Sequence, residues 1–169
     1  MTAHVPPQDG SHADHLIGEV RFLTTPEVRF FRTTVSAPFD KLDDVLDPLL
    51  TELEDAKAVA GIGHLGPIVI RYFEVGEPQV FRMDAGVPVS DDVVAAGEAE
   101  IEVLPSIRCA ALIFWGSLAH IGAAYGALNR AIADAGLKNR GEGREWHLHF
   151  EGDSSPHNII MLQLEVVDV

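Results

Sequence analysis

Three polar residues alternate along a short run near the end of the sequence and are candidates for chemistry. Glu145, His147 and His149 are spaced by two residues in EWHLHF, so on a β-strand all three project from one face. A carboxylate in an apolar cleft is costly unless it is paired, and a cation or a histidine is its natural partner. The pattern therefore indicates a cleft wall that receives a lipophilic cation, with aromatic faces adding cation–π attraction. The alternative is a solvent-facing edge strand that carries ordinary polar residues.

A second group of candidates lies in the first half of the chain. Tyr72, Phe73 and Glu74 are consecutive, and on a strand Tyr72 and Glu74 share one face. We predict that this face looks into the cleft and that Phe73 enters the core. Trp115 lies just before Ser117, a residue suited to capping a helix. Trp115 is either a ring at the mouth of the cleft or part of the packing.

The histidines also raise the question of a metal site. His147 and His149, together with Glu145 or His157, are ligand types that zinc accepts. Because an H-x-H pair is common by chance, we predict no metal and no cofactor. Cys109 lies in an apolar run and is interpreted as a small buried hydrophobe rather than a nucleophile. The sequence contains no nucleotide-binding glycine motif, no G-x-S-x-G and no H-E-x-x-H.

Composition excludes several classes of protein. The 169 residues carry a formal net charge of −14 and a single cysteine, which excludes an internal disulfide framework. Nucleic acid and anionic lipid need clustered Lys and Arg, so we predict neither as a direct partner. The longest apolar stretch, residues 109–115, is far shorter than the roughly 20 residues of a membrane span. No secretory signal precedes it, and we expect a cytoplasmic protein.

The elements that position these candidates form a duplicated unit. At a constant offset of 79 positions, Pro26 meets Pro105, and Leu42 meets Ile121. Each copy predicts two strand segments separated by its proline, then a helix, then two more strands. The later strands are expected at residues 67–75, 79–89, 145–152 and 158–167. Asp40 and Ser117 are the expected helix caps. This order predicts an α+β architecture with an antiparallel sheet and two helices on one face.

The expected domain organisation follows from the same duplication. Residues 1–17 have no apolar periodicity and are predicted to be a flexible leader. Residues 18–169 are predicted to be one domain, with a first half at about 18–90 and a second half at about 98–169. The two halves are expected to be related by a pseudo-twofold axis with a central cleft between them.

The sequence from about residue 18 to residue 167 resembles a known family, most closely in its second half. The segments MDAGVPV (83–89), IEVLPSIRCAALIFWGSLAHIGAAYGALNRAIADAGL (101–137), EWHLHF (145–150) and MLQLEV (161–166) occur in the order and spacing of the GyrI-like small-molecule-binding domain. That domain is the effector-binding part of drug-responsive bacterial transcription activators. The resemblance implies a cleft with aromatic rings and a buried carboxylate, and the matching acidic position here is Glu145. The aromatic that usually follows two residues later is His147 in this chain.

Two functions of different classes follow from these residues. The first is a stand-alone binding protein for a hydrophobic or cationic small molecule, with Glu145, His147, Tyr72, Glu74, Trp115 and His149 as ligand-binding candidates. The second is a hydrolase of a reactive hydrophobic compound, in which Glu145 is the general base and His147 or Tyr72 a proton donor. A protein partner, and the choice between monomer and homodimer, stay open, as does a purely structural role.

Overall fold

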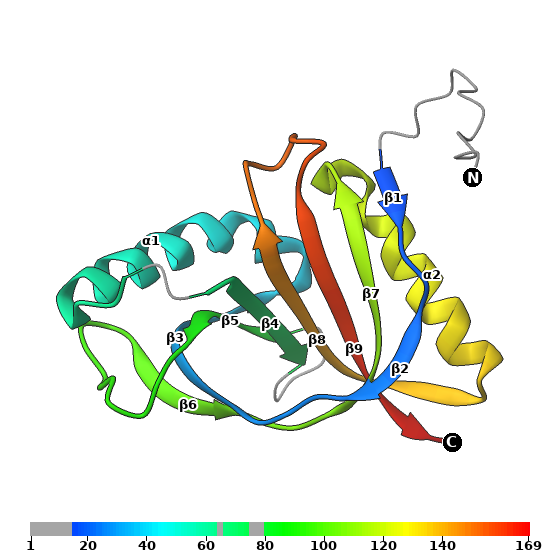
Figure 1. Cartoon of the computed structure of the whole chain (residues 1–169), viewed down its shortest axis with the longest axis horizontal. Coiled ribbons are helices and arrows are strands. Elements are labelled where there is room, and N and C mark those ends of the chain that lie inside the picture. The colour runs from blue at the N-terminus through cyan, green and yellow to red at the C-terminus, as the bar shows by residue number, and fades with distance from the viewer. Residues whose placement is uncertain (1–14, 64–65, 75–79) are drawn as a thin grey trace, which may run out of the picture.

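The computed structural model describes residues 15–63, 66–74 and 80–169, which form one sheet and two helices (Figure 1). The helices are α1 (Leu42–Ala60) and α2 (Ile121–Asp134), and each follows a short 3₁₀ turn. The strands are β1 (His15–Ile17), β2 (Arg21–Thr24), β3 (Val28–Pro38), β4 (Ile68–Glu74), β5 (Val80–Pro88), β6 (Glu100–Leu104), β7 (Arg108–Gly116), β8 (Leu137–His149) and β9 (Ile159–Asp168).

All nine strands belong to one antiparallel sheet in the order β1-β7-β9-β8-β4-β5-β3-β6, with β2 paired to β7. The central pair is β4 and β8, so β3-β5-β4 of the first half lies beside β8-β9-β7 of the second half. Each half runs strand, helix, strand, strand. The predicted α+β class and the duplicated unit are confirmed.

The two halves exchange their first strands. β2 precedes β3 in the chain but pairs with β7, and β6 precedes β7 but pairs with β3. The connections that contain Pro26 and Pro105 therefore cross, and they bond to each other where they meet. The Thr25 amide donates to the carbonyl of Ile107 at 2.9 Å, and the Ile107 amide donates to Thr25 Oγ1 at 3.0 Å. This exchange ties each half to the edge of the other.

Both helices pack on the same face of the sheet. Leu49 and Leu53 of α1 lie in one core cluster with Ile70 of β4, and Leu128 of α2 lies in another with Leu162 of β9. Residues paired across strands share a face, and the pairs Ile70–Glu145 and Glu145–Leu162 carry this face across the centre of the sheet. The alternation of β4 and β8 then decides which side chains point between the helices.

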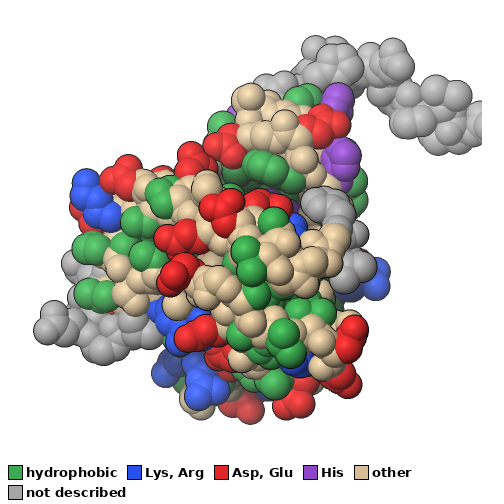
Figure 2. All heavy atoms as spheres, turned by 90° about the vertical axis from the view of Figure 1, so that its left-hand side faces the viewer, with side chains coloured by type: hydrophobic (Ala, Val, Ile, Leu, Met, Phe, Trp, Pro, Cys, Tyr) green, Lys and Arg blue, Asp and Glu red, His purple; other side chains and the backbone are tan. Residues whose placement is uncertain are grey.

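The exposed side of α1 is acidic, as its sequence indicates. Its exposed carboxylates are Asp43, Asp44, Asp47, Glu52, Glu54 and Asp55. Figure 2 shows acidic side chains spread over the side of the molecule where α1 lies. This surface repels polyanions. Within the described residues, no helix is long and apolar enough to cross a membrane.

Several boundaries differ from the sequence prediction. β1 begins at His15 and pairs with β7, so the folded part starts three residues before the predicted position. Residues 1–14 of the predicted leader lie outside the described residues.

β8 begins at Leu137 rather than at residue 145, and an irregularity between Asn139 and Gly143 lets this glycine-containing segment pair with β9. Ser117 caps its turn by accepting from the Ala119 amide, whereas the cap of α1 is Lys41 rather than Asp40.

Candidate functional site

Glu145 lies near the centre of the sheet, on the face that carries both helices. Tyr125 of α2 donates a hydrogen bond from its hydroxyl to Glu145 Oε1. The Tyr72 hydroxyl of β4 in turn donates to the Tyr125 oxygen at 2.5 Å, and the two rings meet edge to face with centroids 6.5 Å apart. Three elements thus place a chain of two hydroxyl groups that ends on one carboxylate.

His147 completes the group around this carboxylate. Its Nε2 lies 3.4 Å from Glu145 Oε2, and its ring meets Phe150 edge to face at 5.2 Å. The side chains of His147 and Glu145 are 13% and 18% exposed. Nε2 is buried and has no hydrogen-bond partner among the described residues. His147 Nε2 is therefore a polar atom without a hydrogen bond beside Glu145 Oε2.

Burial fixes the protonation of the two tyrosines. Burial raises the pKa of Tyr72 above its usual value, and the negative charge of Glu145 raises it further. The pKa of Tyr125 is raised well above its usual value by burial first and by Glu145 second. Both hydroxyl groups are therefore neutral near pH 7 and act as hydrogen-bond donors.

A glycine makes room for this arrangement. Gly143 of β8 pairs with Tyr72 of β4, and the Tyr72 ring lies directly over it. A Cβ atom at position 143 would overlap the ring and hydroxyl of Tyr72. Only glycine fits there without a shift of Tyr72, so Gly143 leaves the room that the Tyr72 hydroxyl needs.

His149 does not join this group although it continues the alternation in the sequence. β8 has an irregularity between His147 and His149, which breaks the two-residue period and leaves His149 exposed. His149 Nε2 instead lies 3.0 Å from Glu151 Oε1, and the same carboxylate is bonded by Ser155 and approached by His157. These contacts hold the pKa of Glu151 at about 2. They make a surface cluster on the β8–β9 connection.

Trp115 and Glu74 also lie away from Glu145. Trp115 pairs with Ile159 of β9 and sits one residue beyond Phe114, which packs under α2, so Trp115 points to the opposite face of the sheet. Glu74 is exposed at the end of β4, where it pairs with Phe81 and borders the edge of a cavity that lies on the opposite face. Of the six candidates, the structure brings together Glu145, His147 and Tyr72.

Phe73 corrects another expectation. It was predicted to enter the core, but it lies between two guanidinium groups on the face away from the helices. The Arg71 and Arg82 guanidinium carbons are 4.4 and 5.5 Å from the Phe73 ring centroid. On this face the neighbouring strand β5 places Arg82 opposite Phe73.

Sequence reasoning missed Tyr125. Its place in the apolar stripe of α2, beside Ile121 and Leu128, favoured an interpretation as core. The available signal was its hydroxyl, because a buried tyrosine hydroxyl generally needs a hydrogen-bond partner, and no partner was assigned to it. Within the described residues, no three His, Cys, Asp or Glu side chains are placed to hold a metal ion.

Comparison with known proteins identifies the fold. No protein-family model and no curated protein matches the sequence. The crystal structure of the EcmrR C-terminal domain is similar, with a TM-score of 0.62 and 16% identity over 90% of this chain and 99% of that chain. SAV2435 bound to tetraphenylphosphonium is similar with a TM-score of 0.66 and 9% identity, over 88% and 94% of the two chains.

A third similar structure is described as a hydrolase encoded by lin2189 from Listeria innocua. It has a TM-score of 0.57 and 11% identity, over 88% of this chain and 92% of that chain. These likenesses span nearly all of the described residues. The chain shares the fold of these structures, and its α+β architecture is consistent with the GyrI-like fold that the sequence resemblance implies.

Proposed function

We propose that this protein binds a hydrophobic cation at Glu145, between the two helices. The observation that carries the proposal is the kind of neighbour that Glu145 has. Its described contacts are one tyrosine hydroxyl and one histidine ring. In contrast, Asp84, Glu102 and Glu142 on the other face each contact at least two arginines. A carboxylate that is mostly buried without Arg or Lys favours a cationic ligand as its counter-charge.

The surroundings of the carboxylate suit the body of such a ligand. Tyr72, Tyr125 and Phe150 supply aromatic rings near Glu145 and His147, and ring faces attract cations that are poorly hydrated. Ile68 and Ile70 of β4 add apolar surface on the same face. The description of SAV2435 with tetraphenylphosphonium supports the proposal, because that ligand combines one positive charge with four aromatic rings.

The two oxygens of Glu145 would have different tasks. Oε1 accepts the Tyr125 hydrogen bond, which holds the carboxylate in place. Oε2 faces only the His147 ring among the described polar groups, and it is the oxygen left for a ligand.

A hydrolase is the second candidate, and one observation favours it. Catalysis by a general base needs a second polar group within hydrogen-bond reach of the carboxylate, and Tyr125 meets this requirement. Glu145 would accept a proton from water while the oxygen of that water attacks an electrophilic carbon. The proton would then pass to the leaving oxygen, and the Tyr72–Tyr125 chain would orient the carboxylate.

Isothermal titration with a matched pair of ligands tests the proposal. Tetraphenylphosphonium carries the charge, and triphenylphosphine oxide is a neutral compound with similar rings. Glu145→Gln keeps the shape of the side chain, and Glu52→Gln on the exposed side of α1 is the control for net charge. We expect Glu145→Gln to weaken the affinity for the cation at least about tenfold, which corresponds to about 1.4 kcal/mol of binding free energy. The affinity for the neutral compound should stay unchanged.

The same variants decide between the candidates. Equal affinity of the wild-type protein and Glu145→Gln for the cation would overturn the binding proposal. Consumption of a neutral electrophilic ester or lactone by the wild-type protein, lost in Glu145→Gln with unchanged affinity, would place the hydrolase first.

A further inference from the structure

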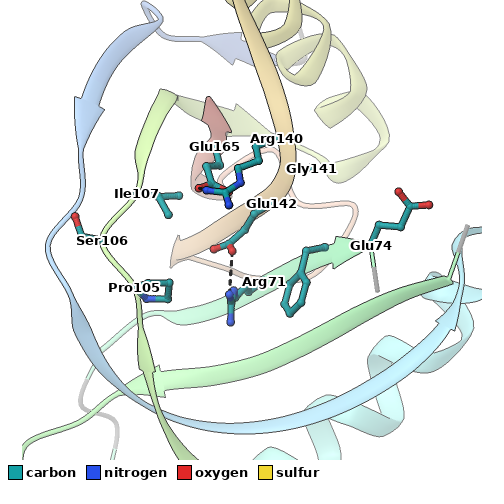
Figure 3. Close-up of a pocket in the computed structure, with 10 residues that line it drawn as sticks. Arg71, Glu74, Pro105, Ser106, Ile107, Arg140, Gly141, Glu142 and Glu165 are labelled. Atoms are coloured by element: carbon teal, nitrogen blue, oxygen red, sulfur yellow. Dashed lines mark hydrogen bonds and ion pairs between the residues drawn. The ribbon is translucent and has the colours of Figure 1, made fainter. Parts of the chain in front are cut away.

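A cavity of about 740 Å³ lies on the face of the sheet opposite to Glu145 (Figure 3). Its walls come from the end of β4, the first part of β8, the end of β9 and the crossing connection at residues 105–107. This volume is within the range of about 300–1,000 Å³ that small-molecule sites occupy. The proposed cation site does not use it, since the sheet separates the two.

Arg71 forms one wall of this cavity and is 9% exposed. Its Nη2 donates to Glu142 Oε2 at 2.9 Å, a contact that Figure 3 shows at the centre of the cavity wall. Its Nη1 lies at the longer distances of 3.5 Å from Asp84 and 3.6 Å from Glu102. Its Nε is buried and has no hydrogen-bond partner among the described residues.

The buried charges around Arg71 have more donors than acceptors. Three buried guanidinium nitrogens have no hydrogen-bond partner among the described residues: Arg32 Nη1, Arg71 Nε and Arg144 Nη1. Among the described carboxylates, Asp84 Oδ2 is the one buried oxygen without a hydrogen bond, although it lies 3.5 Å from Arg71 Nη1. Unmade hydrogen bonds of buried charged groups are costly. Of these three arginines, Arg71 lines the cavity, and an anion there would offer an acceptor to its Nε.

Three carboxylates border the cavity: Glu142 and Glu165 are paired with arginines, and Glu74 extends away from Arg71 in Figure 3. Glu142 bonds to both Arg71 and Arg144, and Glu165 pairs with Arg140 at 3.2 Å. Burial alone raises the pKa of Glu142, but the hydrogen bond from Arg71 and the charge of Arg144 bring it below its usual value. Glu142 is therefore ionised and neutralised by two guanidinium groups, so it does not oppose an anion as a free carboxylate would.

Part of the remaining wall is apolar. Phe73, Pro105 and Ile107 line the cavity beside Arg71, and Arg140 at the mouth is 65% exposed. We propose that this cavity binds a small organic anion, with its carboxylate or phosphate group at Arg71 and its apolar body against Phe73 and Ile107. This inference does not rest on the proposed cation site.

Titration of the ¹⁵N-labelled chain with benzoate, phenyl phosphate and benzylamine tests the inference. Benzoate and benzylamine have the same ring and opposite charge. We expect the two anions to shift the amide signals of Phe73, Ser106, Ile107 and Gly141 and to saturate below about 10 mM. Benzylamine is expected to leave these signals in place.

Variants locate the charge that matters. Arg71→Lys keeps the charge but loses Nε, and we expect benzoate to bind at least about tenfold more weakly. Arg140→Gln removes an exposed charge at the mouth and is expected to weaken binding about two- to fivefold. Arg130→Gln, the same change on the exposed side of α2, is the control and should change nothing. If Arg71→Lys does not fold, the wild-type shifts and Arg140→Gln still decide the question.

Two results would overturn the inference: shifts that do not saturate, or shifts of equal size with benzylamine. Glu145→Gln separates this test from that of the proposed function. The variant should bind benzoate like the wild-type protein while its affinity for tetraphenylphosphonium falls, so either proposal can fail alone.

Discussion

Replacement of Tyr125 by Phe tests the hydroxyl chain without changing the shape of the core. The substitution removes the donor to Glu145 Oε1 and the acceptor of the Tyr72 hydroxyl. A hydrogen bond to a charged group contributes about 1.5–3 kcal/mol, and a neutral one about 1 kcal/mol. The carboxylate is 18% exposed, so water replaces only part of the loss. We expect Tyr125→Phe to lower the free energy of unfolding by about 1.5–3 kcal/mol.

Tyr72→Phe is the matched variant, because it removes only the first hydroxyl of the chain. Tyr125 still donates to Glu145 in that protein, so the expected loss is about 1 kcal/mol. Urea unfolding followed by circular dichroism gives both values from the midpoints. In a domain of this size, a loss of 1 kcal/mol lowers Tm by roughly 2–4 °C.

A double-mutant cycle makes the test specific to the contact. Tyr125→Phe in the Glu145→Gln background should cost less than in the wild-type protein, with a coupling energy of about 1 kcal/mol or more. Additive losses, or a Tyr125→Phe loss no larger than that of Tyr72→Phe, would refute the idea that Tyr125 holds an ionised carboxylate in place.

Two further predictions concern the other parts of the structure. Gly143→Ala places a Cβ against the Tyr72 ring and should lower the free energy of unfolding in urea by about 1–3 kcal/mol. Gly122→Ala on α2 is the control, because its Cβ meets open space, and it should be neutral or stabilising. Equal effects of the two variants would contradict the packing argument. The pKa of Glu142 is lowered in the folded state, so the unfolded chain binds more protons between the folded pKa and about pH 4.5. Stability from this group is present above that range and is lost as pH falls through it, by up to about 1.4 kcal/mol per pH unit. Glu142→Gln should flatten the acid limb of a stability–pH curve, and an unchanged limb would count against the ion pairs.

The sequence predicted the duplication but could not show the exchange of strands. The offset that matches Pro26 to Pro105 is visible in the chain, and it correctly separates β2 from β3 and β6 from β7. Which strand β2 pairs with is a long-range choice. A local hairpin of β2 with β3 has the same alternation of side chains as the observed pairing with β7, so the pattern alone does not distinguish them.

The candidate site was predicted in part for a similar reason. Alternation correctly places Tyr72, Glu145 and His147 on one face, because those stretches of β4 and β8 are regular. His149 lies beyond an irregularity that depends on the pairing of β8 with β9. Tyr125 comes from a helix, and its distance from Glu145 depends on how α2 packs across the sheet. The cavity at Arg71 depends on the crossing connections, which no local pattern reveals.

The most direct test of the central claim is to locate a bound cation on the protein. Tetraphenylphosphonium titrated into the ¹⁵N-labelled chain should shift the amide signals of Tyr72, Tyr125, Glu145 and His147, and the shifts should saturate together with one dissociation constant. Shifts confined to Phe73, Ser106 and Gly141 on the opposite face, or no saturable shift at Glu145, would contradict the assignment of Glu145 as the counter-charge of the ligand.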